Sequence, residues 1–175
     1  MNSVVKLSRR LSYLLRHCPE SANLHMDPHG YVLVSELLQQ CPEYTDAILK
    51  DIVETDDKRR YSFSDDGLRI RANQGHSFSV DLNLVPQTPP DVLYHGTVSK
   101  FVDSIMETGL RRQSRQYVHL STSIETAKKV GGRRGEPVIL KINAKRMNQD
   151  GYTFYVSENG VWLTDYVPTQ YILKL

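Results

Sequence analysis

The chain has 175 residues, 39% of them hydrophobic and 24% charged, a balance typical of one sizeable globular domain or two small lobes. No apolar run approaches the ~20 residues that a membrane helix needs. Arg9, Arg10 and Arg16 interrupt the segment where a signal peptide would be apolar. Two cysteines, Cys18 and Cys41, provide neither a disulfide framework nor a zinc site. We therefore expect a cytoplasmic protein that binds no metal.

Charge is distributed unevenly along the chain. The formal net charge is only +2, and residues 1–85 carry 10 basic against 12 acidic side chains. Residues 111–134 instead hold seven basic side chains against Glu125 alone. Such a stretch either attracts a polyanion or forms a solvated basic face. Its members are Arg111, Arg112, Arg115, Lys128, Lys129, Arg133 and Arg134.

The N-terminal part begins with a helix, a turn and a strand. Apolar residues recur at helical spacing over residues 4–15, and Pro19 ends that helix. The turn Asp27-Pro28-His29-Gly30 then precedes an apolar strand over residues 31–34.

Two short helices and a hairpin follow. Ser35 is positioned to cap a helix that continues through Gln40, and Thr45 begins the next. Residues 60–64 and 68–71 alternate in polarity around Asp66-Gly67, as in a β-hairpin. Three short helices followed by a hairpin is the order of a winged-helix domain, which usually binds nucleic acid.

A proline-rich segment over residues 87–91 marks the expected boundary between two lobes, residues 1–86 and 87–175. The second lobe should consist mostly of sheet, with two short helices packed on it. One helix covers residues 98–108 and is closed by Gly109, and Ser123 caps the other. The expected strands cover residues 92–94, 118–120, 137–142, 152–156, 161–164 and 171–175, with Asn159-Gly160 forming a hairpin turn.

Two polar groups in the first lobe are candidates for phosphate binding. Leu15-Arg16-His17 ends the first helix, and Arg9 shares a helix face with Arg16, although cations at a helix C-terminus also complement its dipole. The string Arg71-Ala72-Asn73-Gln74-Gly75-His76-Ser77 is more specific. It combines a guanidinium suited to phosphate oxygens with amides that can read base or ribose edges. It also has a simpler reading as a polar loop.

The second lobe contains two His–x–hydroxyl motifs, His95-Gly96-Thr97 and His119-Leu120-Ser121. We expect each to follow or end a strand just before a helix, where helix N-termini favour phosphates and Gly96 would let a ligand approach the backbone. The loop Gly131-Gly132-Arg133-Arg134-Gly135 combines backbone freedom with paired guanidiniums, which suits an anion or an exposed loop equally.

Absent motifs narrow the chemistry further. The sequence has no clustered carboxylates for magnesium, no phosphate-binding P-loop, no dinucleotide-binding glycine fingerprint and no supported Cys-His nucleophile. A site rich in Arg and His but poor in carboxylates suits an anionic substrate that is itself the nucleophile.

In this order, the motifs resemble those of the tRNA/RNA 2′-phosphotransferase family over nearly the whole chain, and the string from Arg71 to Ser77 is highly specific to it. The resemblance implies an α+β fold with an N-terminal winged-helix lobe and a C-terminal ADP-ribosyltransferase-type lobe of mixed β-sheet. It implies an enzyme that takes RNA bearing a 2′-phosphate and uses NAD as co-substrate. The family activity leaves the oligomeric state open, and we expect a monomer. The region around Asn159 offers Val161 rather than the catalytic glutamate of many protein-modifying relatives, which suits a phosphate nucleophile.

The resemblance also assigns site residues. The catalytic set is Arg16, His17, Arg71 and Arg133, with Arg134 as the rival for the last position. The NAD-contacting set is His95, Gly96, Thr97, Gly109, Leu110, His119 and Ser121. Gln74, His76 and Arg134 are expected to bind the RNA substrate.

The mechanism implied by the resemblance has two steps. The RNA 2′-phosphate displaces nicotinamide from NAD, and the 2″-hydroxyl then attacks the phosphorus. The products are RNA with a 2′-hydroxyl and ADP-ribose 1″,2″-cyclic phosphate. The arginines would hold the phosphate, and His17 would protonate the departing RNA oxygen.

Three other functions fit parts of the pattern. The two His–x–hydroxyl motifs also characterise 2H phosphoesterases, although only 24 residues separate His95 from His119. The NAD lobe would serve equally for ADP-ribose transfer onto nucleic-acid ends or protein. A winged-helix binding module with a degenerate second lobe is the non-enzymatic alternative.

Overall fold

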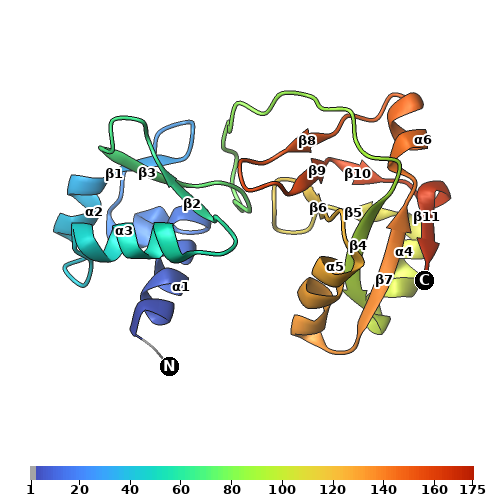
Figure 1. Ribbon diagram of the computed structural model, residues 1–175, viewed down its shortest axis with the longest axis horizontal. Coiled ribbons are helices and arrows are strands. Elements are labelled where there is room, and N and C mark those ends of the chain that lie inside the picture. The colour runs from blue at the N-terminus through green and yellow to red at the C-terminus, as the bar shows by residue number, and fades with distance from the viewer. Residues whose placement is uncertain (1–2) are drawn as a thin grey trace. The chain divides into compact units, whose positions relative to one another are not determined.

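The computed structural model describes residues 3–175, which form a mixed α+β fold in two compact units (Figure 1). The first unit ends at Asn83 and the second begins at Leu84, three residues before the boundary expected from the prolines. Pro86 already belongs to the second unit, where it forms a β-bridge with Tyr155. Within the described residues, no helix has the length and apolar character needed to cross a membrane.

The first unit packs three α-helices against a small antiparallel sheet. The strands run in the order β1-β3-β2, and the register places Tyr31 opposite Arg71. Fully buried leucines and isoleucines from all three helices and β3 form its core. The elements are α1 (Ser3–Arg16), η1 (Pro19–Ala22), β1 (Tyr31–Leu33), α2 (Val34–Gln40), α3 (Asp46–Thr55), β2 (Tyr61–Phe63) and β3 (Arg69–Ala72).

Most of the helix-cap and hairpin predictions for the first unit are confirmed. The Thr45 hydroxyl caps α3 by accepting a hydrogen bond from the Ile48 N–H at 3.2 Å, and β2 and β3 form the expected hairpin. The predicted cap at Ser35 is wrong, because α2 begins at Val34 directly after β1. The helix begins without a side-chain cap, and its first residue, Val34, is buried.

The second unit contains three antiparallel sheets and three α-helices among its described residues. The sheets have the orders β11-β7-β4, β6-β9-β8 and β10-β5, and a bridge between Tyr94 and Ser121 links β4 to β6. Its elements are β4 (Leu93–Val98), α4 (Ser99–Thr108), β5 (Leu110–Arg111), β6 (Val118–Leu120), α5 (Ile124–Gly131), η2 (Gly132–Arg134), β7 (Pro137–Ile142), α6 (Ala144–Gln149), β8 (Tyr155–Val156), β9 (Trp162–Thr164), β10 (Tyr166–Val167), η3 (Thr169–Tyr171) and β11 (Ile172–Lys174).

Two features of this unit differ from the prediction. Strand β4 continues to Val98, so the His95-Gly96-Thr97 motif lies inside a strand rather than after one. Helix α6 and the β5–β10 pair were not predicted from the sequence. Helix α6 has six residues, of which Ala144 and Met147 are buried, too few apolar positions to produce a helical pattern.

Helix α5 packs against β4 through two facing glycines. A Cβ at Gly96 would lie 1.8 Å from the Ala127 carbonyl oxygen, and one at Gly131 would lie 2.9 Å from the Gly96 carbonyl carbon. Both values are far below van der Waals contact, so neither position has room for a side chain. Close backbone packing therefore requires glycine at Gly96 and Gly131.

This packing predicts that Gly96→Ala destabilises the second unit by about 3 kcal/mol, because the methyl group must displace helix backbone. Gly132→Ala is the matched control, since its φ of −60° is helical and a Cβ there meets only Pro137 Cγ at 3.9 Å. Urea unfolding followed by Trp162 fluorescence measures both variants. Equal stability of the two variants would contradict the packing argument.

Candidate active site

The C-terminal end of α1 and the loop after β3 meet in the first unit. Arg16 is the last residue of α1 and its side chain is buried, whereas His17 is exposed. The Ser77 N–H donates to the Arg16 carbonyl oxygen at 2.9 Å, and the Ser77 hydroxyl lies 3.1 Å from His17 Nδ1. A Cβ at Gly75 would lie 3.6 Å from Arg16 Nε, so the loop passes directly beside the guanidinium. Arg9, expected on the same helix face, remains exposed.

Arg71 is held on an aromatic platform. It lies in β3, half-buried, and its guanidinium carbon is 4.7 Å from the centre of the Tyr31 ring across the β1–β3 pair. Such cation–π contacts fix a guanidinium without neutralising its charge. Sequence reasoning missed Tyr31, since the strand register that places it opposite Arg71 has no local signal.

His76 shows that this part of the unit is electropositive. Its side chain is 1% exposed, and neither ring nitrogen has a hydrogen-bond partner among the described residues. Burial, followed by the positive charge of Arg16, His17 and Arg71, lowers the pKa of His76 to about 4. His76 therefore remains neutral at physiological pH.

The two amides of the loop have different roles. Asn73 is buried, accepts from the Ser62 hydroxyl at 2.6 Å and donates to the Arg59 carbonyl oxygen at 2.8 Å. Its side chain therefore links the loop to Ser62 and Arg59 within the first unit. Gln74 is half-buried, and its Oε1 has no partner among the described residues, which leaves it the better candidate for a substrate contact.

The two His–x–hydroxyl motifs lie side by side in the second unit. Tyr94 and Ser121 exchange two main-chain hydrogen bonds of 2.8 Å, and His95 Nδ1 lies 3.0 Å from the His119 carbonyl oxygen. Burial is the main cause of a lowered pKa for His95, so its neutral form is favoured. Adjacent strands thus present both histidines and Ser121 in one region of the unit.

Three residues predicted to contact NAD also have clear structural roles. The Cβ direction of Gly96 is filled by α5, and Gly109 closes α4 with a φ of +80° against Tyr166. Leu110 is 5% exposed and belongs to the hydrophobic core. Thr97 is also buried. Gly96 and Gly109 could therefore meet a ligand only through main-chain atoms.

The predicted catalytic residues divide between the units, three in the first and Arg133 in the second. Arg133 is exposed in the short 3₁₀ helix η2, which is followed by Gly135 at a φ of +136°. The Arg134 side chain lies outside the described part of the structure, so the choice between the two arginines stays a prediction. Across residues 3–175, no three potential metal-ligating side chains form a cluster.

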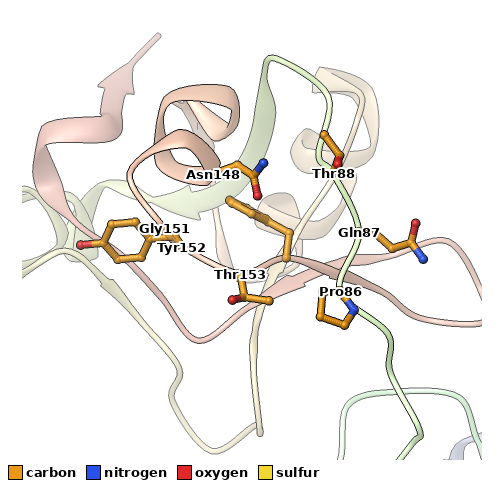
Figure 2. A pocket seen from close by; sticks show the side chains of 8 residues that line it. Pro86, Gln87, Thr88, Asn148, Gly151, Tyr152 and Thr153 are labelled. Atoms are coloured by element: carbon orange, nitrogen blue, oxygen red, sulfur yellow. The ribbon is translucent and has the colours of Figure 1, made fainter.

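A separate cavity of about 240 Å³ opens beside the loop after α6 (Figure 2). Segment 86–88 lines one side of it, and Asn148 and residues 151–154 line the rest. It shares no residue with either group described above and contains no charged side chain. None of the predicted site residues lines this cavity.

Comparison with known proteins identifies the family. The family model described as "RNA 2'-phosphotransferase, Tpt1 / KptA family" matches residues 2–166. The chain belongs to this family. The resemblance inferred from its motifs is thereby confirmed.

Relatives of this RNA 2′-phosphotransferase family match the chain over nearly its full length. Each is named "Probable RNA 2'-phosphotransferase". The protein from Acaryochloris marina is 52% identical over 97% of this chain and 96% of its own. That from Nostoc punctiforme is 51% identical over 98% and 97%, and that from Flavobacterium johnsoniae is 50% identical over 98% and 96%.

The burial of His76 predicts that the folding stability of this family member falls at acidic pH. Above pH 6.5, His76 is neutral in both the folded and the unfolded chain. As the pH falls from 6.5 to about 4, the unfolded chain binds a proton at His76 that the folded chain does not, and stability falls by about 3 kcal/mol. Replacement by neutral glutamine should remove this part of the decline.

Urea unfolding of the parent and His76→Gln, followed by circular dichroism across this pH range, measures the difference. The comparison concerns the slope of stability against pH rather than the absolute stability, because the substitution also changes packing. Equal slopes for the two proteins would show that other groups cause the acid sensitivity.

Proposed function

We propose that this chain is an NAD-dependent RNA 2′-phosphotransferase. It transfers an internal RNA 2′-phosphate to NAD and gives 2′-hydroxyl RNA, ADP-ribose 1″,2″-cyclic phosphate and nicotinamide. Family membership supports the reaction class. The structural observation that carries the proposal is the gathering of Arg16, His17 and Arg71 around the loop that contains the buried His76.

The first unit would bind the RNA phosphate. The guanidiniums of Arg16 and Arg71 match phosphate oxygens in geometry and charge, and Arg16 would act from a buried position where electrostatic attraction is weakly screened. A phosphate dianion attacks without a general base, so a site without a carboxylate is sufficient. Arg133 of the second unit would add charge stabilisation in the transesterification step.

His17 would donate a proton to the departing RNA 2′-oxygen. It is exposed, and the Ser77 hydroxyl at 3.1 Å from Nδ1 orients its ring. The loop that carries Ser77 is itself fixed by the hydrogen bond to the Arg16 main chain. This arrangement couples the orientation of the acid to the residue proposed to bind the phosphate.

The second unit would bind NAD, which is a substrate of the reaction. The residues present suit it, because the neutral form of His95 is favoured and Ser121 adds a hydroxyl from the adjacent strand. Neutral donors and acceptors of this kind can pair with carboxamide and ribose groups. The nicotinamide-bearing ribose of NAD would supply the carbon that the RNA phosphate attacks.

The two units would correspond to the lobes implied by the resemblance. In the first, the order of three helices, a hairpin and an antiparallel β1-β3-β2 sheet supports a winged-helix lobe. In the second, the small antiparallel sheets with packed helices support an ADP-ribosyltransferase-type lobe. Family membership favours this reading over a 2H phosphoesterase and over a binding module.

The direct test uses a short RNA with one internal 2′-phosphate, incubated with the protein in EDTA with and without NAD. We expect conversion to the 2′-hydroxyl RNA only with NAD, together with ADP-ribose 1″,2″-cyclic phosphate. Phosphate loss without NAD would indicate a phosphoesterase. No reaction under either condition would refute the proposed activity.

The role of His17 is tested by His17→Ala, with His25→Ala as a control for loss of an exposed histidine from the same unit. If His17 is the general acid, the second step should slow by about 10²–10⁴-fold and the RNA–phosphate–ADP-ribose diester should accumulate. His25→Ala should retain the parent rate. Rapid conversion to product by His17→Ala, without diester, would exclude this role.

A further inference from the structure

Arg115 contacts one of the two histidines in the second unit. It lies in the exposed segment between β5 and β6, four residues before His119, and its Nη1 is 2.9 Å from His119 Nδ1. A hydrogen bond within the same segment joins its two sides: Arg112 Nη1 donates to the Gln116 carbonyl oxygen at 3.3 Å. Arg115, which the sequence identified only as part of a basic stretch, therefore contacts a residue of the predicted NAD site.

The chemistry of this contact fixes where the His119 proton lies. A guanidinium only donates hydrogen bonds and remains charged in proteins, so His119 Nδ1 must be the acceptor. An imidazole that accepts at Nδ1 is neutral and carries its proton on Nε2. His119 thus has a hydrogen-bond donor at Nε2.

His95 carries its proton on the other ring nitrogen, Nδ1. Its Nδ1 lies 3.0 Å from the His119 carbonyl oxygen, and a carbonyl oxygen only accepts, so His95 Nδ1 carries a proton. Burial and the positive charge of Arg115 both favour neutral His95 by lowering its pKa. In that neutral form, Nε2 of His95 is an acceptor.

We infer that Arg115 is a positioning residue that holds His119 in its Nε2–H tautomer, so that neighbouring strands offer NAD one imidazole donor and one imidazole acceptor. Binding of NAD rests on the proposed function, whereas the tautomer is a property of the protein alone. A pair of this kind suits a ligand group that both accepts and donates hydrogen bonds, such as a carboxamide or a ribose hydroxyl.

The first experiment uses the full chain without substrates. Nitrogen-15 NMR of labelled histidines at neutral pH should show His119 with a bare Nδ1 and a protonated Nε2. In Arg115→Ala, a fraction of His119 with a proton on Nδ1 should appear, because the guanidinium no longer occupies that nitrogen. Lys128→Gln removes the same charge from exposed α5 and should leave the parent spectrum unchanged.

Two results would overturn the inference: a protonated Nδ1 on His119 in the parent chain, or the same Nδ1-protonated fraction in Arg115→Ala as in the parent. Neither depends on activity, so they remain informative even if the chain does not turn over NAD. A failed activity assay with the expected spectra would refute the proposed function and retain the role of Arg115.

A second experiment separates positioning from general folding. Glutamine can place an amide N–H near the Nε2 position of His119, whereas asparagine reaches only the Nδ1 position. We expect His119→Gln to keep a KM for NAD about three- to tenfold lower than His119→Asn, the effect of one hydrogen bond. Arg115→Ala should raise KM by a similar factor with a smaller change in kcat. Equal KM values for the two His119 variants would contradict the donor role.

Discussion

The burial of a positively charged guanidinium dominates the first unit. Arg16 is 8% exposed, and removing a cation from water costs free energy that its surroundings must offset. The loop from Asn73 to Ser77 passes beside this guanidinium at Gly75, while Tyr31 holds the guanidinium of Arg71 by a cation–π contact. Binding an anion would stabilise this concentration of positive charge electrostatically. Burial of the His76 ring, together with this positive charge, explains why His76 is neutral there.

In the second unit, the corresponding constraint is steric. Gly96 and Gly131 allow α5 to approach β4 more closely than any side chain would permit. That approach fixes one face of β4, and its bridge to β6 through Tyr94 and Ser121 fixes the relation between the two histidine motifs. The glycine of the His-Gly-Thr motif thus has a packing role that exists without any ligand.

Arginine and histidine side chains differ in charge in the two groups of candidate residues. The arginines carry permanent charge suited to phosphate, whereas His76 and His95 are held neutral by burial. A neutral imidazole does not repel neighbouring guanidiniums, and His95 in addition makes a directional hydrogen bond to the His119 carbonyl oxygen. The proposed chemistry needs both properties, since one substrate is a phosphate dianion and the other presents amide and hydroxyl groups.

The sequence by itself determined the elements with strong local signals and the reaction class. Helical spacing located α1 and α3, Asp66-Gly67 located the first hairpin, and the string from Arg71 to Ser77 pointed to the family. These features depend on neighbours in the chain or on residue identity, and both can be recognised in the amino-acid sequence alone.

Only the tertiary structure decided how the candidate residues are supported. It placed Tyr31 under Arg71, used the Asn73 amide within the fold and directed Arg115 at His119. It also showed that a helix covers Gly96, which the sequence had suggested as an opening for a ligand. Register, burial and side-chain contacts arise from segments that meet only after folding, so no local pattern encodes them.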